Sequence, residues 1–456
     1  MYECPNCGGN LKFDIEQQLL KCDYCLTTQD PYQITKDKDA EEDNRFDVTI
    51  FTCPQCGGEI LGTDTSVAEF CSFCGASTIL HSRISKERRP SWIIPFSQTK
   101  EACKKAYSAR LKRAIFAPDA LKDEKAIESF RGIYMPYWSY SITQKGDISL
   151  KGKKSFRRGD YVYTNHYDMG GSIDAYYHDL SYDASSSFSD NISECIAPFH
   201  VKGMRKFTPS FLSGFYADTA DVDRTLYEKD ALTIAQTTSY DRIKKVPEFS
   251  GIQFSLKDVD LHSSMERPER VMYPVWFMSY RKNDRVAYAT VNGQTGKVAA
   301  DIPIDTKKYV IGSLILAVPI FLLLNLNSVI TATSVLNISI LLEIVAFVTY
   351  LIEISRIHHR DSRKDDRGYL ASQKNPSNTP LSFKTILYDL LGLLFAFMTS
   401  MCIFLFAPVE DAWYYGGTAA AFLGILPTIV EIINKYNILA TRRLPQFDRK
   451  GGDDDA

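Results

Sequence analysis

The sequence lacks a dominant charge of either sign. Its 456 residues carry 53 Lys and Arg against 55 Asp and Glu, which gives a formal net charge of −2. A near-neutral chain has no overall field that draws it to nucleic acid or to an acidic membrane. The start also lacks the basic and apolar regions of a signal peptide, because Met1 is followed directly by Tyr-Glu-Cys-Pro. We therefore expect the N-terminal part in a reducing compartment.

Familiar catalytic motifs are absent as well. The sequence contains neither the H-E-x-x-H motif of zinc proteases nor the nucleophile elbow of serine hydrolases. The segment Gly293-Gln-Thr-Gly296-Lys297 resembles a phosphate loop only superficially, because the G-x-x-x-x-G-K-[ST] spacing is missing and alternating strand residues flank it. We predict a hairpin turn there, and a protein that is not an enzyme.

Cysteine, by contrast, follows a regular pattern. Eight of the 11 cysteines form four C-x-x-C pairs, and each cysteine of the first two pairs recurs 49 residues later. In both units 14 residues separate the pairs, the length of a hairpin that returns the second pair to complete a tetrahedral Zn²⁺ shell. A redox pair or a disulfide is the alternative, and the duplicated spacing favours metal. The sequence predicts two zinc ribbons with the ligands Cys4, Cys7, Cys22, Cys25, Cys53, Cys56, Cys71 and Cys74.

Both zinc sites are predicted to be structural, because four cysteine ligands leave no open position for a substrate. Glycine follows the knuckles at Gly8, Gly57 and Gly75, where a tight turn requires a free backbone. Leu26 takes the glycine position in the second knuckle of unit one, which predicts a less regular turn. The predicted domains are ribbon one at residues 1–30, an acidic, solvated linker at 31–46 and ribbon two at 47–82.

Residues 83–307 are predicted to form a β-rich α+β domain. A strand should begin at Trp92-Ile-Ile-Pro-Phe96, and Asn292-Gly293 marks a hairpin. The segments 134–140 and 273–280 share a Pro-x-Trp motif and are predicted to be equivalent strands of a duplicated unit, with each proline at a strand edge or start. Helices are predicted at 97–116, capped by Ser97, at 122–130 and at 221–242.

One basic cluster stands out in this domain. Its members are Lys151, Lys153, Lys154, Arg157 and Arg158, followed by Tyr161, Tyr163 and Tyr167. Basic residues interleaved with aromatics can hold single-stranded nucleic acid through phosphate contacts and base stacking. The five basic residues are therefore candidates for nucleic-acid contact. The alternative is a solvated hairpin whose aromatics belong to a sheet, and the mixed charge of the region favours it.

Four long apolar runs follow, at about residues 309–326, 329–352, 386–407 and 413–433. Because a helix needs about 20 apolar residues to cross a bilayer, they predict a four-helix transmembrane region over 308–436 and a tail at 437–456. Lys and Arg gather before the first run, in the loop 353–385 and in the tail, whereas the two other loops have none. The positive-inside rule then predicts a multi-pass cell-membrane protein with both termini in the cytoplasm.

Glu343 lies in the middle of the second apolar run. An ionisable side chain at that depth is a candidate for function, as a proton relay or an ion site of a transporter. A protonated carboxyl that hydrogen-bonds to a neighbouring helix is the alternative. Asp389 and Glu431 are expected only near helix ends.

The order of parts resembles a bacterial family of TFIIB-type zinc-ribbon membrane proteins. The residues that carry the likeness are the Cys-Pro-x-Cys-Gly-Gly knuckles at Cys4 and Cys53, Trp92–Phe96, Pro136-Tyr-Trp138 and Asn292–Lys297. Members are often labelled primosomal-helicase-like, but this chain has no Walker A loop and no helicase core, so unwinding is not carried over. Some are encoded beside flotillin-like and phage-shock-type proteins, so the resemblance implies cytoplasmic protein partners of that kind at the membrane.

Three functions are consistent with these features. The first is a membrane-anchored zinc-ribbon scaffold that docks cytoplasmic partners at the bacterial membrane, in a membrane-stress response if the resemblance holds. The second is a membrane-tethered nucleic-acid-binding protein. The third is a transporter or channel with a zinc-ribbon regulatory domain.

Overall fold

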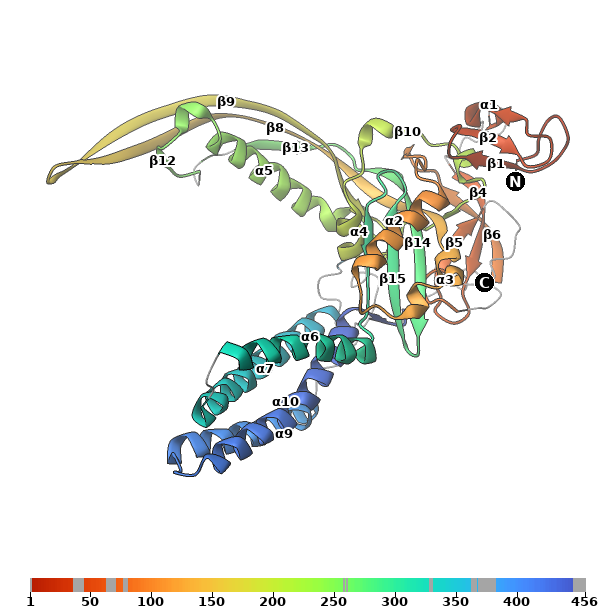
Figure 1. Ribbon diagram of the computed structural model, residues 1–456. Coiled ribbons are helices and arrows are strands. Elements are labelled where there is room, and N and C mark those ends of the chain that lie inside the picture. The colour runs from red at the N-terminus through yellow and green to blue at the C-terminus, as the bar shows by residue number, and fades with distance from the viewer. Residues whose placement is uncertain are drawn as a thin grey trace.

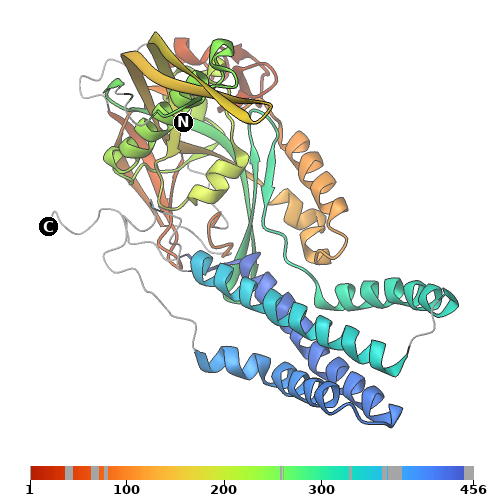
Figure 2. The ribbon, with the colours of Figure 1, turned by 90° about the vertical axis from the view of Figure 1, so that its left-hand side faces the viewer.

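A computed structural model describes residues 2–35, 45–62, 71–76, 81–256, 259, 261–327, 331–361, 367 and 383–445. These residues form a mixed α+β protein with a small N-terminal sheet, a large β-rich domain and a group of long helices (Figure 1 and Figure 2). Much of the predicted acidic linker, most of the predicted basic loop and the end of the predicted tail lie outside the described residues.

The first cysteine unit forms its own antiparallel sheet, followed by a short helix. Its elements are β1 (Leu11–Asp14), β2 (Leu19–Cys22), β3 (Thr28–Gln29) and α1 (Pro31–Thr35). The sheet packs on the large domain through Phe13 and Phe211, whose ring centroids are 5.3 Å apart. The backbone N–H of Phe13 also donates to the carbonyl of Ser213 at 3.0 Å. These two contacts attach the first unit to the large domain.

The second cysteine unit is continuous with the large sheet. Its strands are β4 (Arg45–Thr52), β5 (Glu59–Gly62) and β6 (His81–Arg88), and β4 pairs with both of the others. Strand β5 pairs with β11 (Tyr216–Ala217), and β11 pairs in turn with β8 (Arg131–Arg158). The hydrogen-bond ladder therefore runs from the second unit directly into the centre of the domain.

The large sheet has 14 strands within the described residues, with β8 and β14 (Glu269–Lys282) at its centre. These two strands are antiparallel, with Ile133 opposite Val275. Besides these two and β4, β5, β6 and β11, the sheet contains β7 (Trp92–Ile93), β9 (Tyr161–Asp183), β10 (Arg205–Lys206), β12 (Gln253–Phe254), β13 (His262–Met265), β15 (Arg285–Asn292), β16 (Val298–Ala300) and β17 (Arg442–Arg443). The predicted hairpin at Asn292-Gly293 is confirmed between β15 and β16, so the segment that resembles a phosphate loop is a turn.

The two Pro-x-Trp strands are neighbours, β8 and β14, and their prolines lie inside the sheet. The prediction of an edge or start position was therefore wrong. Pro136 lies where β8 passes from β11, paired up to Tyr134, to β9, paired from Tyr137 onward. Pro274 lies where β14 passes from β7 to β15. A residue at a change of partner needs no N–H for the ladder, so proline fits there. The duplication itself stays a prediction.

The predicted helices of the domain are present with shorter bounds. They are α2 (Lys100–Arg113), α3 (Glu124–Glu128) and α5 (Glu228–Lys244). The cap of α2 is Thr99, whose side chain accepts from the Ala102 N–H at 3.2 Å, so the predicted Ser97 cap was wrong. The N–H of Ser97 instead donates to the Gly293 carbonyl at 2.8 Å. The remaining short elements are α4 (Asp190–Ile196), η1 (Asp119–Leu121), η2 (Val201–Gly203), η3 (Pro209–Leu212), η4 (Arg224–Tyr227) and η5 (Pro247–Phe249).

Strands β8 and β9 continue beyond the domain as a long two-stranded arm, with α5 packed along part of it (Figure 1). The arm ends in a turn between Arg158 and Tyr161, which face each other. Its covered part buries Leu150 and Met169 against Ile243 of α5. The hairpin of the arm is thus covered by α5 near the domain and has no such cover at its end.

The apolar half of the chain is helical. Its helices are α6 (Thr306–Asn327), α7 (Ala332–Asp361), α9 (Phe383–Phe406) and α10 (Asp411–Leu439). Among the described residues, three segments are long and apolar enough to cross a membrane: Ala332–Ile357, Asp389–Phe406 and Asp411–Leu439. Helix α6 covers the first predicted run but is not one of the three, so a four-helix membrane region is not confirmed.

Both ends of the helical half join the domain at one place. The Asn437 side chain near the end of α10 donates to the carbonyl of Ile304, just before α6, at 2.8 Å, and accepts from its N–H at 2.6 Å. Strand β17 then pairs with β15, and the Arg285 guanidinium donates to the Thr441 carbonyl at 2.9 Å. The chain therefore leaves the domain just before α6 and returns to it after α10, and these two points lie next to each other.

Candidate metal centres

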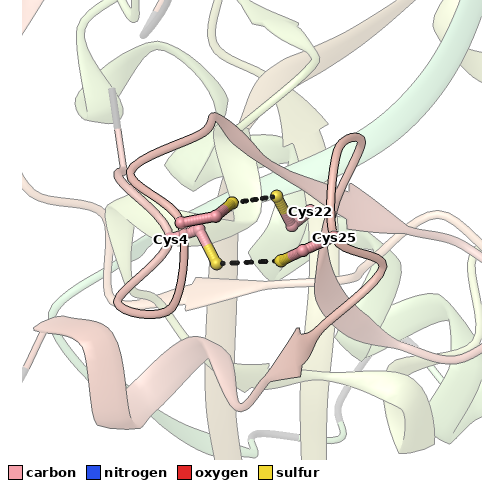
Figure 3. A group of neighbouring side chains, drawn as sticks. Cys4, Cys22 and Cys25 are labelled. Carbon is pink, nitrogen blue, oxygen red and sulfur yellow. Dashed lines mark hydrogen bonds between the residues drawn. The ribbon is translucent and has the colours of Figure 1, made fainter.

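The eight cysteines of the repeat form two four-cysteine groups. In the first, Sγ of Cys4 lies 3.5 Å from that of Cys25, and Sγ of Cys7 lies 3.5 Å from that of Cys22 (Figure 3). In the second, the corresponding distances are 3.8 Å for Cys53 to Cys74 and 3.7 Å for Cys56 to Cys71. Within each group all four Sγ atoms lie within 4.8 Å of one another. Each group is therefore positioned to hold one metal ion.

The backbone explains why the sulfurs converge. In each unit the N–H of the first cysteine donates to a glycine carbonyl five residues later, at 2.7 Å from Cys4 and 2.9 Å from Cys53. The residue after each knuckle then donates back to the first cysteine of its pair, as Gly8 does to Cys4 at 2.8 Å and Gly57 to Cys53 at 2.8 Å. The repeat in sequence is thus a repeat in hydrogen bonding, and each knuckle holds its two sulfurs on one side.

Three of the four knuckles place glycine in the left-handed region, with φ of 73° at Gly8, 73° at Gly57 and 69° at Gly75. Leu26 occupies the same conformation, with φ of 59°. A side chain with a Cβ is strained there, because the Cβ approaches the following carbonyl oxygen. The Leu26 N–H also donates to the Cys22 carbonyl at 3.1 Å, as in the other knuckles, so the prediction of a less regular turn was wrong: the turn is preserved and the leucine is strained in it.

The two groups differ in their surroundings. All four cysteines of the second are at most 1% exposed and belong to the core of the domain, with Phe277 and Tyr288. The Tyr288 hydroxyl donates to the carbonyl of Phe73, between the two cysteines of a knuckle, at 2.8 Å. In the first group Cys4 and Cys22 are buried, Cys25 is partly exposed and Cys7 is exposed, and Tyr24, next to Cys25 in the sequence, is 78% exposed. One site is buried throughout, and the other reaches the surface on one side.

Neighbouring sulfurs within a group shift the pKa values of their thiols in opposite directions, so the four thiols of a group do not all ionise without a metal ion. Hydrogen bonding to Cys56 holds the pKa of Cys53 well below that of a free thiol, whereas Cys53 in turn raises the pKa of Cys71. In the first group the Thr27 hydroxyl, 3.1 Å from Cys25 Sγ, lowers the pKa of Cys25 to about 5. A divalent cation at the centre would hold all four sulfurs as thiolates.

The other cysteines take no part in these groups. Cys103 is buried in α2, where burial raises the pKa of its thiol, and Cys195 and Cys402 are exposed. Among the described residues, the two cysteine groups are the clusters of His, Cys, Asp and Glu that are close enough to hold a metal.

Glu343 is buried between the long helices, with 1% of its surface exposed. Its Oε1 lies 3.5 Å from the Ser400 hydroxyl of α9, which lies 3.5 Å from the Gly417 carbonyl of α10. Within the described residues its Oε2 has no hydrogen-bond partner. The acid therefore faces the interior of the helix bundle.

A second polar layer of the bundle was missed by the sequence analysis. Lys435 of α10 lies 3.0 Å from Asp389 of α9 and 2.9 Å from Glu431, and the Tyr350 hydroxyl of α7 donates to Asp389 at 2.6 Å. Asp389 is the first residue of the apolar segment of α9, which agrees with its expected place near a helix end. The spacing of Glu431 and Lys435, four residues apart on one helix, was the signal that could have found the pair.

The five basic candidates for nucleic-acid contact all lie on β8, in the outer part of the arm. Each is exposed. Opposite them on β9 lie Asp168, His166, Asn165, Val162 and Tyr161. The structure thus gathers the cluster along one strand of a projecting hairpin.

Fold and site together define a mixed α+β protein with two N-terminal four-cysteine groups and three helices able to cross a membrane. No model of a known protein family matches the sequence, and no solved structure matches it. The chain is similar to the uncharacterized protein YdjG of Bacillus subtilis (strain 168), with 27% identity over 313 residues. The match covers 67% of this chain and 91% of that protein. Because that protein is uncharacterized, the similarity indicates no activity.

Proposed function

We propose that this protein is a membrane-anchored zinc-ribbon scaffold that docks cytoplasmic proteins and performs no chemistry of its own. The observation that carries the proposal is the contrast between the two cysteine groups. Both are complete four-sulfur sets in a part of the chain that joins apolar helices, and only the first set reaches the surface. A metal ion with four protein ligands has no open position for a substrate. At the surface, such a site can serve as a platform for binding but not as a reaction centre.

Zinc is the ion that fits both groups best. Four thiolates select soft or borderline metals, and Zn²⁺ prefers a tetrahedron. A Zn–S bond of about 2.3 Å implies sulfurs about 3.8 Å apart, and the pairs that face each other are separated by 3.5 to 3.8 Å. Iron would satisfy the same ligands, so elemental analysis of purified protein tests this part. Two zinc ions per chain are expected, and a content below one would contradict it.

The junction with the domain supports four membrane crossings. If α7, α9 and α10 each cross, the start of α7 and the end of α10 lie on opposite sides of the bilayer. The end of α10 is hydrogen-bonded to Ile304, directly before α6. Helix α6 must therefore cross as well to connect that side with the start of α7, although its apolar run is only just long enough.

Charge at the junction supports a cytoplasmic domain. Lys307 and Lys308 lie in the first turn of α6, and Arg442 and Arg443 follow α10. Basic residues flanking membrane helices favour the cytoplasmic side, and that compartment keeps thiols reduced for metal binding. Both termini would then be cytoplasmic in a multi-pass protein.

The first cysteine unit is the docking surface that we favour. Tyr24 and Leu26 at its second knuckle are 78% and 65% exposed. Exposed aromatic and aliphatic side chains on a rigid turn are suited to anchor a partner. The resemblance to TFIIB-type zinc-ribbon membrane proteins makes flotillin-like or phage-shock-type proteins the partners to test first, and a role in membrane stress follows only if one of them binds.

The test is affinity capture from solubilised membranes with the full chain. Its comparison variant is Tyr24→Ala, and the matched control is Tyr176→Ala, another exposed tyrosine, on β9, at 55%. We expect one protein to be enriched by the unmodified chain and by Tyr176→Ala and lost with Tyr24→Ala, at unchanged metal content. If Tyr24→Ala captures the same proteins, the first unit is not the docking surface.

Transport is the second candidate, and Glu343 is the observation that favours it. A buried acid inside a helix bundle with a carboxylate oxygen that lacks a partner among the described residues fits an ion or proton site. Glu343→Gln reproduces the neutral acid. In proteoliposomes, loss of an ion or proton flux with unchanged thermal stability would support transport. A protein without measurable flux, or with the same flux after the substitution, would make Glu343 a packing residue.

A further inference from the structure

The outer end of the arm carries exposed apolar side chains beyond the part that α5 and β12 cover. On the face of Leu150 and Met169, the polar pair Lys154 and Asn165 separates the buried residues from the next aromatic pair. Near the domain, Leu150 and Met169 are buried by α5 and the segments around β12. Strand β12 pairs with β8 as far as Lys153. Beyond it, Phe156 and Tyr163 lie opposite each other in register on the face that Leu150 and Met169 share, because alternate residues of a strand point to the same side. They are 48% and 49% exposed.

The end of the arm is both apolar and basic. Its turn exposes Tyr161 by 73% and Val162 by 68%. Residues 151–163 contain the five basic side chains named above and one acid, Asp160. We call residues 151–163 the arm tip. It therefore presents aromatic and aliphatic groups within a cationic surround, which suits an anionic partner with an apolar interior.

An anionic lipid bilayer fits this surface better than single-stranded nucleic acid does. Stacking on bases requires aromatic faces that are open, but Phe156 and Tyr163 stack on each other, with centroids 5.6 Å apart and an interplanar angle of 16°. Val162, at the turn, offers an aliphatic group that has no role in base stacking. Aromatic side chains near the headgroups, with Lys and Arg beside them, are the composition of a membrane interface.

The arm lies in the same protein as the long helices, and both extend from the domain toward the left of Figure 1, with the arm above the helices. Anchoring by those helices would keep the whole protein at the membrane, which raises the effective concentration of lipid around the arm tip. Weak interfacial contacts then suffice for binding.

We propose that the arm tip is a second membrane contact, which inserts its aromatic and aliphatic side chains into the interface of an anionic bilayer. The proposal rests on the membrane anchoring proposed above and goes beyond it. Helices hold the domain to the membrane, and the arm tip sets its tilt. Each basic residue near an anionic surface changes the ratio of bound to free tip about fivefold, so Arg157→Gln together with Arg158→Gln lowers that ratio about 25-fold.

The experiment places a tryptophan reporter in the full chain, reconstituted in nanodiscs that contain phosphatidylglycerol with brominated acyl chains. Tyr161→Trp reports on the arm tip, and Tyr176→Trp, closer to the domain on the same strand, is the matched control. The spectrum of the unmodified protein, with its four tryptophans, is subtracted. Co-purification of protein and lipid tests the helical anchoring separately, so failure of the anchoring and failure of the arm-tip contact are distinguishable.

We expect brominated anionic lipid to quench the reporter at 161 and not the reporter at 176, with less quenching in phosphatidylcholine and after the two arginine substitutions. Equal quenching at both positions would overturn the proposal. So would an oligonucleotide that binds the arm tip while the lipid leaves the reporter at 161 unquenched, because the partner would then be nucleic acid.

Discussion

Replacement of Leu26 tests whether backbone strain weakens the first metal site. Leu26 adopts φ of 59°, in the left-handed region. A residue with a Cβ is destabilised there by about 1–2 kcal/mol relative to the right-handed form, and glycine avoids this strain. Glycine in turn loses about 0.5–1 kcal/mol through the greater freedom of the unfolded chain. Leu26→Gly should therefore exceed Leu26→Ala in stability by about 0.5–1 kcal/mol.

The comparison with alanine isolates the backbone, because both substitutions remove the same exposed side chain. Metal binding and folding are coupled in a unit of this size, so the difference should appear in metal affinity. About 0.5–1 kcal/mol corresponds to a metal dissociation constant about two- to fivefold lower for Leu26→Gly than for Leu26→Ala. Relative to the unmodified protein, Leu26→Gly should be close to neutral, since it also loses the remaining contacts of the leucine.

The assay is competition with a chromophoric chelator on the metal-loaded full chain. The ion of the exposed first group should be released before the ion of the buried second group, and Cys7→Ser assigns the first phase by removing it. The second phase should be identical in all Leu26 variants and serves as an internal control. If Leu26→Ala binds metal as tightly as Leu26→Gly, strain at this knuckle does not limit affinity.

Three further outcomes follow from the same contacts. Gly75→Ala should weaken the second site by about 0.5–1 kcal/mol on the same balance of strain and chain entropy, seen as earlier release of its ion in the chelator assay, since its φ is 69°. Cys56→Ser and Cys7→Ser should each remove one metal equivalent by elemental analysis, but only Cys56→Ser should lower the melting temperature of the β-rich domain strongly. Lys435→Gln should destabilise the helix bundle by about 3 kcal/mol in detergent, measured by the loss of helical circular dichroism on heating, and adding Asp389→Asn should restore part of that loss.

Local spacing predicted local structure well in this chain. The C-x-x-C pairs form the two cysteine groups, and Asn292-Gly293 forms its hairpin, because each depends on residues close in sequence. The features that the sequence did not predict depend on contacts between segments that are distant in the sequence. Before α2, the N–H of Ser97 donates to the carbonyl of Gly293, a residue distant in sequence, and the helix begins only after Thr99, which caps it. The ion pair between Lys435 and Asp389 joins α10 to α9, two segments that local spacing does not bring together.

The two cysteine units also show how one motif takes two roles. Their knuckles make the same backbone hydrogen bonds, so the motif itself does not distinguish them. The difference lies in what surrounds them: β5 pairs with β11 and carries the second unit into the core, whereas the first keeps a separate sheet that contacts the domain around Phe211. The cysteines of the second unit are all buried, whereas Cys7 and Tyr24 of the first unit are exposed and accessible to a partner. Selection for docking would therefore act on exposed residues such as Tyr24, and selection for stability on the second unit.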